Sequence, residues 1–266
     1  MLPTSASLAT RYGTIAYREA GSGPPLILLH GLAGSSKSWE AQFGALANIR
    51  RVIAWDCPGY GGSDELPGDA PTLADYADAL LAFADGLGLE RFDLLGHSMG
   101  GVIAGRFAAL QPDRVRRLIL SGTRTGFTRR DPASFLSRIE ELRSLTPEEF
   151  GARRADGMVA ASAPRETWRR VAAVAAAVRP AGFAAAARML TRADNADLLH
   201  RIRAPALVLA GEADRIALPA EAEALAQAVA ARLIMIAGAA HAPYLEQAAA
   251  YNDALRTFLS EPPARG

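Results

Sequence analysis

The sequence predicts an α/β protein with a mostly parallel, eight-stranded sheet that is flanked by helices, and with a helical segment inserted after the sixth strand. Short, continuous apolar runs end at Gly, Pro or polar residues, as strands buried on both faces do. Helical patterns separate most of these runs, and such alternation is typical of a parallel sheet. The alternation stops between residues 123 and 205, where no strand-like run occurs.

The expected elements follow the chain in order. A hairpin at the edge of the sheet comes first, with strands at residues 9–12 and 14–18 on either side of Gly13. Six buried strands are expected at residues 26–29, 52–55, 92–95, 118–120, 206–210 and 233–236. Helices are expected at residues 38–47, 73–86, 101–110, 219–230 and 248–259. The hairpin and the buried strands together predict a sheet of about eight strands.

The interruption predicts two structural units. Residues 1–122 and 206–266 would form the α/β core, and residues 123–205 a helical cap above the carboxyl ends of the strands. The cap has fifteen arginines and nine acidic residues, a formal charge of +6, while the remainder has fourteen basic and nineteen acidic residues, a charge of −5. A basic cap is either a pocket roof that attracts a carboxylate-bearing substrate or a solvated helical surface. Composition alone favours the solvated surface.

Composition excludes several classes of function. The formal net charge of +1 supplies no basic field that would attract nucleic acid. Cys57 is the only cysteine, which excludes an intramolecular disulfide and favours a reducing compartment. No apolar run is long enough to span a bilayer, and residues 1–12 carry no secretory pattern. We therefore expect a cytoplasmic protein that binds neither nucleic acid nor a membrane, and nothing in the sequence demands an obligate partner chain.

A serine stands at the junction between the third buried strand and a helix. It is the centre of the pentapeptide Gly96-His97-Ser98-Met99-Gly100. A strand that enters a helix through so tight a turn strains its central residue, and the flanking glycines remove side chains that would clash. The Ser98 hydroxyl would then project above the sheet. Because a serine hydroxyl is a poor nucleophile, it needs a base, an orienting acid and an oxyanion hole.

The base and the acid are expected on loops at the same end of the sheet as Ser98. His241 follows the last strand and is the candidate general base. Asp214 follows the strand at residues 206–210 and is the candidate acid that orients the imidazole. Glu212 leaves that strand two residues earlier and is the alternative acid.

The other histidines are weaker candidates. His97 lies inside the serine turn and is expected to point elsewhere, and His200 is expected at the surface near the end of the cap. His30 ends a strand ahead of a glycine-rich loop, where an imidazole that bonds the neighbouring backbone is favoured. His30 and Gly31 are also retained as candidate substrate-binding residues, because they border the expected site.

An oxyanion hole needs backbone N–H groups aimed at the developing charge. Met99, directly after the serine, supplies one candidate, and Leu32 in the loop after the first buried strand supplies the second. That loop, residues 31–38, also resembles a phosphate-binding P-loop, but Ser36 stands where the second glycine should be. Nucleotide binding is therefore not expected.

With these motifs the chain resembles the α/β-hydrolase fold family over nearly its whole length outside the cap. The order Ser98, Asp214, His241 is the order of the catalytic triad in that family. The loop Asp-Cys-Pro-Gly-Tyr-Gly-Gly-Ser at residues 56–63 adds a further familiar element. Within the family the chain is most similar to small bacterial hydrolases of the 3-oxoadipate enol-lactonase and carboxylesterase type. The resemblance implies a serine hydrolase that cleaves a small carboxylic ester or lactone through an acyl-enzyme, with no metal or organic cofactor.

Two alternatives remain within the family. The C–C hydrolases of meta-cleavage products are next most similar, and Arg188 would serve as their substrate-binding cap arginine. In those enzymes an aromatic residue commonly follows the histidine closely, whereas Ala242 and Pro243 come first here. Other members keep the triad but act as ligand receptors, although nothing in the cap identifies a partner surface. Dehalogenases and epoxide hydrolases carry Asp at the nucleophile position, so Ser98 argues against both.

Overall fold

The computed structural model describes residues 1–68, 70–128 and 131–262. Its strands are β1 (Ser5–Thr10), β2 (Gly13–Ala20), β3 (Pro25–Leu29), β4 (Arg51–Trp55), β5 (Phe92–His97), β6 (Val115–Ser121), β7 (Ala206–Gly211) and β8 (Arg232–Ile236). They form one eight-stranded sheet in the order β1-β2-β4-β3-β5-β6-β7-β8. β2 pairs antiparallel with β1 and β4, and the other neighbours are parallel. The predicted fold class is confirmed.

The predicted position of the first hairpin strand was wrong. It begins at Ser5 and ends at Thr10, whereas residues 9–12 were expected. β1 is an edge strand, and its residues 5–7 are exposed. Such a strand lacks the continuous apolar run that marks a strand buried on both faces, so its sequence gives a weak signal.

β6 also differs, because it begins at Val115 rather than at residue 118. A charged residue, Arg117, interrupts the apolar run. Its side chain is buried, and its guanidinium lies 3.8 Å from the carboxylate of Asp93 on β5. This opposite charge within the sheet is what makes the buried arginine tolerable.

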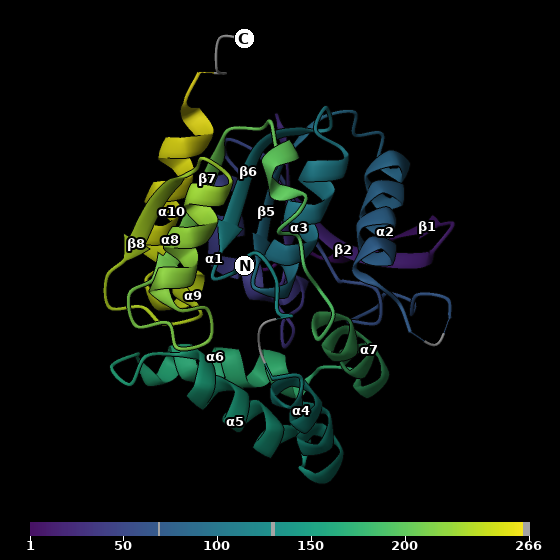
Figure 1. Cartoon of the computed structure of the whole chain (residues 1–266), viewed down its shortest axis with the longest axis vertical. Coiled ribbons are helices and arrows are strands. Elements are labelled where there is room, and N and C mark those ends of the chain that lie inside the picture. The colour runs from purple at the N-terminus through teal and green to yellow at the C-terminus, as the bar shows by residue number, and fades with distance from the viewer. Residues whose placement is uncertain (69, 129–130, 263–266) are drawn as a thin grey trace.

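Helices cover both faces of the sheet (Figure 1). They are α1 (Glu40–Leu46), α2 (Leu73–Gly86), α3 (Met99–Leu110), α8 (Pro219–Ala228), α9 (Pro243–Glu246) and α10 (Ala248–Ser260). α2 packs against α3 on one face, and α1 packs against α10 on the other. The β3 side chains alternate between the two hydrophobic cores, with Leu26 and Leu28 in one, and Ile27 and Leu29 in the other. Because successive side chains of a strand point to opposite faces, these strands are apolar at every position.

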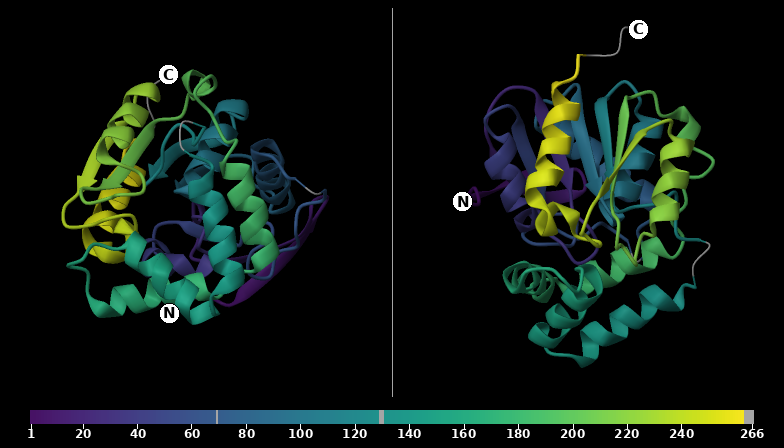
Figure 2. Two further views of the ribbon diagram at one scale, coloured as in Figure 1. Left: turned by 60° about the horizontal axis from the view of Figure 1, so that its bottom comes forward. Right: turned by 90° about the vertical axis from the view of Figure 1, so that its left-hand side faces the viewer.

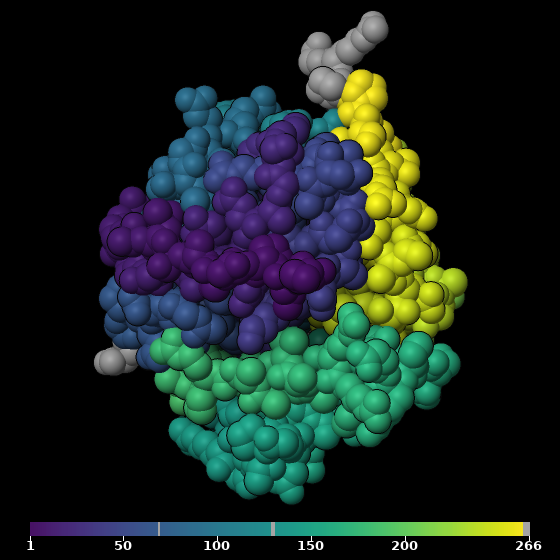
Figure 3. Space-filling model, turned by 180° about the vertical axis from the view of Figure 1, so that it is seen from behind, coloured from purple at the N-terminus to yellow at the C-terminus, as the bar shows by residue number. Residues whose placement is uncertain are grey.

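Four further helices, the α4–α7 insertion, lie between β6 and β7 in the chain. They are α4 (Ala133–Ser144), α5 (Pro147–Met158), α6 (Arg165–Ala176) and α7 (Pro180–Leu190). They gather at one end of the sheet as a separate layer, seen in teal and green (Figures 1 and 2), which lies against the core when viewed from behind (Figure 3). These helices lie where the helical segment was expected. Their role as a cap, and the division into domains at residues 122 and 206, stay predictions.

Two short 3-10 helices, η1 (Ser36–Trp39) and η2 (Leu199–Arg201), complete the described elements. Among the described helices, no single one combines the length and the apolar composition needed to cross a membrane. α6 and α7 meet that requirement only as a pair, and a bend of 99° separates them.

Candidate active site

Ser98 lies in the sharp turn between β5 and α3. Its backbone has a φ of 52° and a ψ of −115°, a combination that residues other than glycine rarely adopt. The Ser98 N–H donates to the carbonyl of Ser121 at 2.9 Å, and the Thr123 hydroxyl donates to the Ser98 carbonyl at 2.8 Å. One backbone carbonyl and one side-chain hydroxyl, both at the end of β6, therefore hold the residue in its strained conformation. The strained turn predicted at this position is confirmed.

Two glycines make the turn possible. A Cβ placed on Gly96 would lie 2.2 Å from the carbonyl oxygen of Gly100, and a Cβ on Gly100 would lie 2.3 Å from that of Leu29. Both distances are far shorter than a van der Waals contact between carbon and oxygen. Any side chain at either position would have to displace the backbone around Ser98.

Three side chains from separate loops form one hydrogen-bonded chain. The Ser98 Oγ lies 3.1 Å from Nε2 of His241, and Nδ1 of His241 lies 2.8 Å from Oδ2 of Asp214. The three residues follow β5, β8 and β7, which are parallel strands of one sheet, so their loops meet at the same edge. Only 4 % of the His241 side chain and none of the Asp214 side chain is exposed. The structure thus brings together the three residues that the sequence proposed as a triad.

The surroundings of Asp214 keep its carboxyl ionised. Burial raises the pKa of this carboxyl, but His241 and the N–H groups of Ile216 and Ala217 lower it by more, so the pKa lies below its ordinary value. An ionised carboxylate only accepts hydrogen bonds, so Nδ1 of His241 carries the proton and donates it to Asp214. The Nε2 lone pair then faces the Ser98 hydroxyl, as proton removal from serine requires.

The other acid and histidine candidates lie elsewhere. Glu212 and His200 are both exposed. His97 was expected to point away, yet it lines the pocket beside the triad, with its ring centroid 4.9 Å from that of His241. Burial, followed by the nearby His241, lowers the pKa of His97 well below its ordinary value and keeps the ring neutral. The described residues contain no group of three or more His, Cys, Asp or Glu that could hold a metal ion.

The two predicted oxyanion donors belong to the residue after Ser98 and to the loop after β3. Met99 is the first residue of α3, where helix N–H groups lack a partner within the helix. The carbonyl of Gly31 faces the His30 imidazole at 2.8 Å and the Gly34 N–H at 2.9 Å. Because the C=O and N–H of a trans peptide point in opposite directions, the Leu32 N–H is directed away from those donors. Leu32 itself lines the pocket.

The structure does not bring His30 into the pocket. Its Nδ1 donates to the Gly31 carbonyl, and its Nε2 accepts the Cys57 N–H at 3.0 Å, so both ring nitrogens are used by backbone. Burial lowers the pKa of His30, which keeps the ring neutral. The imidazole is thus bonded to neighbouring backbone as expected, and the candidate substrate contact is corrected. Gly31, in contrast, lines the pocket.

Sequence reasoning missed a tyrosine that braces the same loop. The Tyr60 hydroxyl is buried and donates to the carbonyl of Leu32 at 2.8 Å. Burial raises the pKa of Tyr60, so the group remains a donor. Tyr60 belongs to the familiar loop at residues 56–63, but no local pattern reveals that its hydroxyl reaches a loop 28 residues earlier.

A pocket of about 260 Å³ lies between the triad and the α4–α7 insertion. Ser98, His241 and Leu32 border it from the core. Its apolar lining includes Phe127, Phe135, Phe183, Met158 and Leu190 from the chain between β6 and β7. Pockets of this size suit a small ligand.

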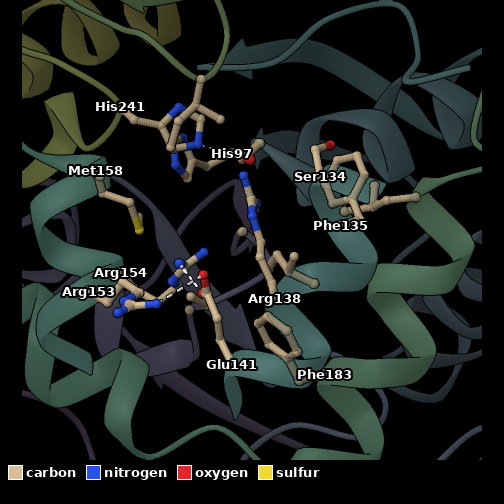
Figure 4. A pocket seen from close by; sticks show the side chains of 18 of the residues that line it. His97, Ser134, Phe135, Arg138, Glu141, Arg153, Arg154, Met158, Phe183 and His241 are labelled. Atoms are coloured by element: carbon tan, nitrogen blue, oxygen red, sulfur yellow. Dashed lines mark hydrogen bonds and ion pairs between the residues drawn. The ribbon is translucent and has the colours of Figure 1, made fainter. Parts of the chain in front are cut away.

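Charged residues from the insertion also line the pocket (Figure 4). Arg138 extends from α4 toward His97, while Arg153 and Arg154 on α5 gather around Glu141. Arg154 and Arg153 both form ion pairs with Glu141, the latter at 3.4 Å. The Arg138 guanidinium lies over the Phe135 ring, 5.2 Å from its centroid. The pocket lining therefore contains a cation packed over an aromatic ring.

The structure does not bring Arg188 to this pocket. Arg188 is exposed and lines two other hollows of the surface. Phe183 and Leu190 on the same helix do line the pocket, and they lie seven residues apart, about two turns. Arg188 is five residues after Phe183 and is rotated by about 140° from that face. The prediction of Arg188 as a substrate contact is therefore corrected by the helix phase.

The sequence carried a signal for the residues that do reach the pocket. Ser134, Arg138 and Glu141 are spaced by four and three residues and share one face of α4. The insertion holds many arginines at similar spacings, and the sequence does not say which face of which helix meets the core. Only the packing of α4 selects Arg138.

Known proteins resemble this chain over most of its length. A family model described as alpha/beta hydrolase fold matches residues 24–248. The (E)-2-((N-methylformamido)methylene)succinate hydrolase of Acinetobacter baylyi is 30% identical over 217 residues, which are 76% of each chain. The crystal structure of the enol-lactonase from Burkholderia xenovorans matches with a TM-score of 0.89 and 26% identity, over 96% of this chain and 100% of that one.

A shorter match has higher identity. An uncharacterized protein of Mycobacterium tuberculosis is 41% identical over 105 residues, which are 40% of this chain and 30% of that protein. The match thus spans less than a third of that relative's length. The family model and the Acinetobacter relative, in contrast, each cover about three quarters of this chain or more. The chain belongs to the α/β-hydrolase fold family.

Proposed function

We propose that this protein is a serine hydrolase that cleaves a small carboxylic ester or lactone through an acyl-enzyme. The observation that carries the proposal is the hydrogen-bonded chain from Ser98 through His241 to Asp214 beside a pocket of about 260 Å³. The names of the similar proteins, a hydrolase and an enol-lactonase, support it.

In the proposed reaction, Nε2 of His241 takes the proton of the Ser98 hydroxyl while Oγ forms a bond to the substrate carbonyl carbon. Asp214 holds the imidazole in the reactive tautomer and stabilises the imidazolium that forms. The tetrahedral intermediate then collapses, the bond to the leaving oxygen breaks, and His241 returns the proton to that oxygen. Water, deprotonated by His241, attacks the acyl carbon in the same way and releases Ser98.

The N–H groups of Leu32 and Met99 are proposed to hold the negative oxygen of the tetrahedral intermediate. Each such donor typically contributes about 100- to 1,000-fold in turnover. The brace from Tyr60 to the Leu32 carbonyl would keep that part of the loop from moving as charge develops.

We further propose that the α4–α7 insertion acts as a cap and that the substrate carries a carboxylate. Arg138 supports this, because it extends into the pocket from α4 toward the triad. A carboxylate there would gain a charge-assisted hydrogen bond from the guanidinium. The Acinetobacter relative is named for a succinate derivative, which also carries carboxylates. Most other described arginines of the insertion lie at the surface, as Arg143 and Arg170 do in pairs with nearby acids.

An anionic pocket ligand would also suit a C–C hydrolase that acts on a vinylogous diketone acid. In that case Arg138, rather than the predicted Arg188, would be the substrate-binding arginine of the cap. A substrate panel separates the two activities. We would compare p-nitrophenyl acetate, an enol-lactone with a free carboxylate and a vinylogous 1,5-diketone acid, expecting preference for the lactone. Preference for the diketone would establish the alternative, and ligand binding without turnover of any substrate would indicate a receptor.

The nucleophile is tested directly with a fluorophosphonate probe and mass spectrometry of the labelled peptide. We expect one label, on Ser98, and none in Ser98→Ala. Cys57 is the internal control, because it is buried and burial raises the pKa of its thiol. Labelling elsewhere in a folded protein would contradict the proposal.

A further inference from the structure

A buried carboxylate outside the triad is bonded to the backbone around the catalytic histidine. Glu246 lies at the end of α9, five residues after His241, and only 8 % of it is exposed. Its Oε1 accepts the N–H groups of Ala240 and Ala242, both at 3.0 Å. These are the two residues that flank His241, so one oxygen atom holds the chain on both sides of the base.

The second oxygen of Glu246 reaches the α4–α7 insertion. Oε2 accepts the Ala160 N–H at 2.7 Å, two residues beyond the end of α5. Next to this bond, the His241 N–H donates to the carbonyl of Met158 at 2.9 Å. Residues 158–160 of the insertion and residues 240–242 of the base loop are thus joined through Glu246 and through one direct hydrogen bond.

Backbone N–H groups hold the Glu246 carboxyl in place. Among the described residues, no arginine or lysine forms an ion pair with Glu246, and burial raises the pKa of its carboxyl despite the three N–H donors. A group whose pKa is raised on folding destabilises the fold when it ionises, relative to its protonated form. What distinguishes Glu246 is therefore its geometry, because one carboxyl joins the residues on both sides of His241 to the end of α5.

We propose that Glu246 is a positioning residue that fixes the loop carrying His241. It also links this loop to the end of α5, so that α5 and the His241 imidazole keep a constant relative position. The inference rests on the proposed function, in which His241 is the base. α5 also carries Arg153, Arg154 and Met158 into the pocket, so the same helix contacts both the ligand space and the base loop.

Glu246→Gln tests the proposal at nearly constant side-chain size. An amide has one accepting oxygen and one donating nitrogen, so it cannot accept from Ala160 while also accepting from Ala240 and Ala242. We expect kcat to fall by roughly ten- to hundredfold with little change in KM, since small misplacements of a catalytic group have effects of that size. Labelling of Ser98 by the fluorophosphonate should slow in parallel.

A pH profile provides a readout that a purely structural role would not move. Loss of a negative charge near the imidazole disfavours the imidazolium, so the acid limb of kcat/KM should move to lower pH in Glu246→Gln. The other ionisable groups around the imidazole are Asp214 and His97 from the core and Tyr244 from α9. The insertion adds four pocket-lining groups: Arg138, Glu141, Arg153 and Arg154. All of these are unchanged in the variant.

A second variant separates the link to the insertion from the charge. Ala160→Pro removes the N–H that Glu246 accepts from the insertion and leaves the Glu246 carboxylate in place. Val159 before it has an extended backbone, with a ψ of 155°, that suits a residue preceding proline. We expect a lower kcat with an unshifted acid limb. If Glu246→Gln does not fold, this variant still carries the test.

The matched control is Glu149→Gln at the other end of α5. Glu149 also accepts a backbone N–H, from Thr146 at 2.9 Å, but it is exposed and does not line the pocket. We expect wild-type kcat and an unshifted profile. Two results would overturn the inference: equal effects of the two glutamine variants, or a Glu246→Gln variant with wild-type kcat and labelling rate. In either case the wild type would still be labelled at Ser98. Failure of Ser98 labelling in the wild type would instead overturn the proposed function.

Discussion

The serine turn and the α4–α7 insertion place their polar residues by different means. Ser98 is held by a turn that tolerates no side chain at Gly96 or Gly100 and by hydrogen bonds to the Ser121 carbonyl and from the Thr123 hydroxyl. Arg138 stands on one face of a helix, is half-buried, and is supported by an aromatic ring. The first region positions a hydroxyl through backbone geometry, while the second positions a charge through the packing of a helix. We infer that the reaction is determined by the core and the choice of substrate by the insertion.

The largest expected effect tests the core side of this comparison. Ser98→Ala removes the nucleophile and should reduce kcat on the order of 10⁶-fold. The melting temperature should be nearly unchanged, because the substitution removes one hydroxyl and its hydrogen bond to His241. Steady-state kinetics on p-nitrophenyl acetate and circular dichroism measure both quantities. Residual activity above one per cent in the purified variant would mean that another group attacks the substrate.

Asp214→Asn should have the next largest effect. The amide can donate its NH₂ group to Nδ1 of His241 and so stabilise the tautomer in which Nε2 carries the proton. In that tautomer His241 cannot take the Ser98 proton. A fall in kcat of about 10⁴-fold is expected. Glu212→Gln is the control, because Glu212 is exposed and should leave kcat at the wild-type level. The reverse pattern would assign the acid to Glu212.

Substitution of the pocket arginine should have a smaller and selective effect. Arg138→Gln should raise KM about tenfold for a carboxylate-bearing substrate, since a hydrogen bond to a charged group contributes roughly 1.5 to 3 kcal/mol before solvent exposure reduces it. KM for neutral p-nitrophenyl acetate should be unchanged. Arg188→Gln is matched in charge and lies outside this pocket, so it should alter neither value. Equal effects of both variants would indicate a general electrostatic field rather than a contact.

The smallest expected effect is on stability at low pH. The pKa of Asp214 is lowered in the folded protein, so its stabilising contribution is present above the unfolded value of about 3.9 and is lost as the pH falls through the lower folded value. The difference in melting temperature between the wild type and Asp214→Asn should therefore be constant from about pH 5 to 7 and shrink below about pH 4. A difference that stays constant down to pH 3 would contradict the lowered pKa.

How much could be predicted from the sequence depended on how local each determinant is. The strands at residues 26–29 and 52–55 are confirmed nearly to the residue, because burial on both faces makes every position apolar. β1 was misplaced because an edge strand needs no such pattern. The turn at Ser98 was predictable because the pentapeptide itself marks a strand-to-helix junction, and the clash that requires Gly96 is with Gly100 and Gly101 of the same turn.

Long-range contacts explain what the sequence did not reveal. Tyr60 and Glu246 act on the site through backbone groups that lie 28 and 86 residues away, at Leu32 and Ala160. No local pattern records which carbonyl or N–H such a side chain will meet. Whether Arg188 or Arg138 faces the pocket depends on how α7 and α4 are rotated about their axes when they pack on the core.

By itself, the sequence determined the fold class, the strained turn at Ser98 and the order of Ser98, Asp214 and His241 along the chain. These depend on apolar periodicity and on backbone sterics, which act over a few residues. Only the tertiary structure decided which insertion residues face the pocket and which buried groups brace the base loop. Those outcomes depend on how helices rotate and dock, and on hydrogen bonds between segments far apart in the chain, for which neighbouring residues carry no information.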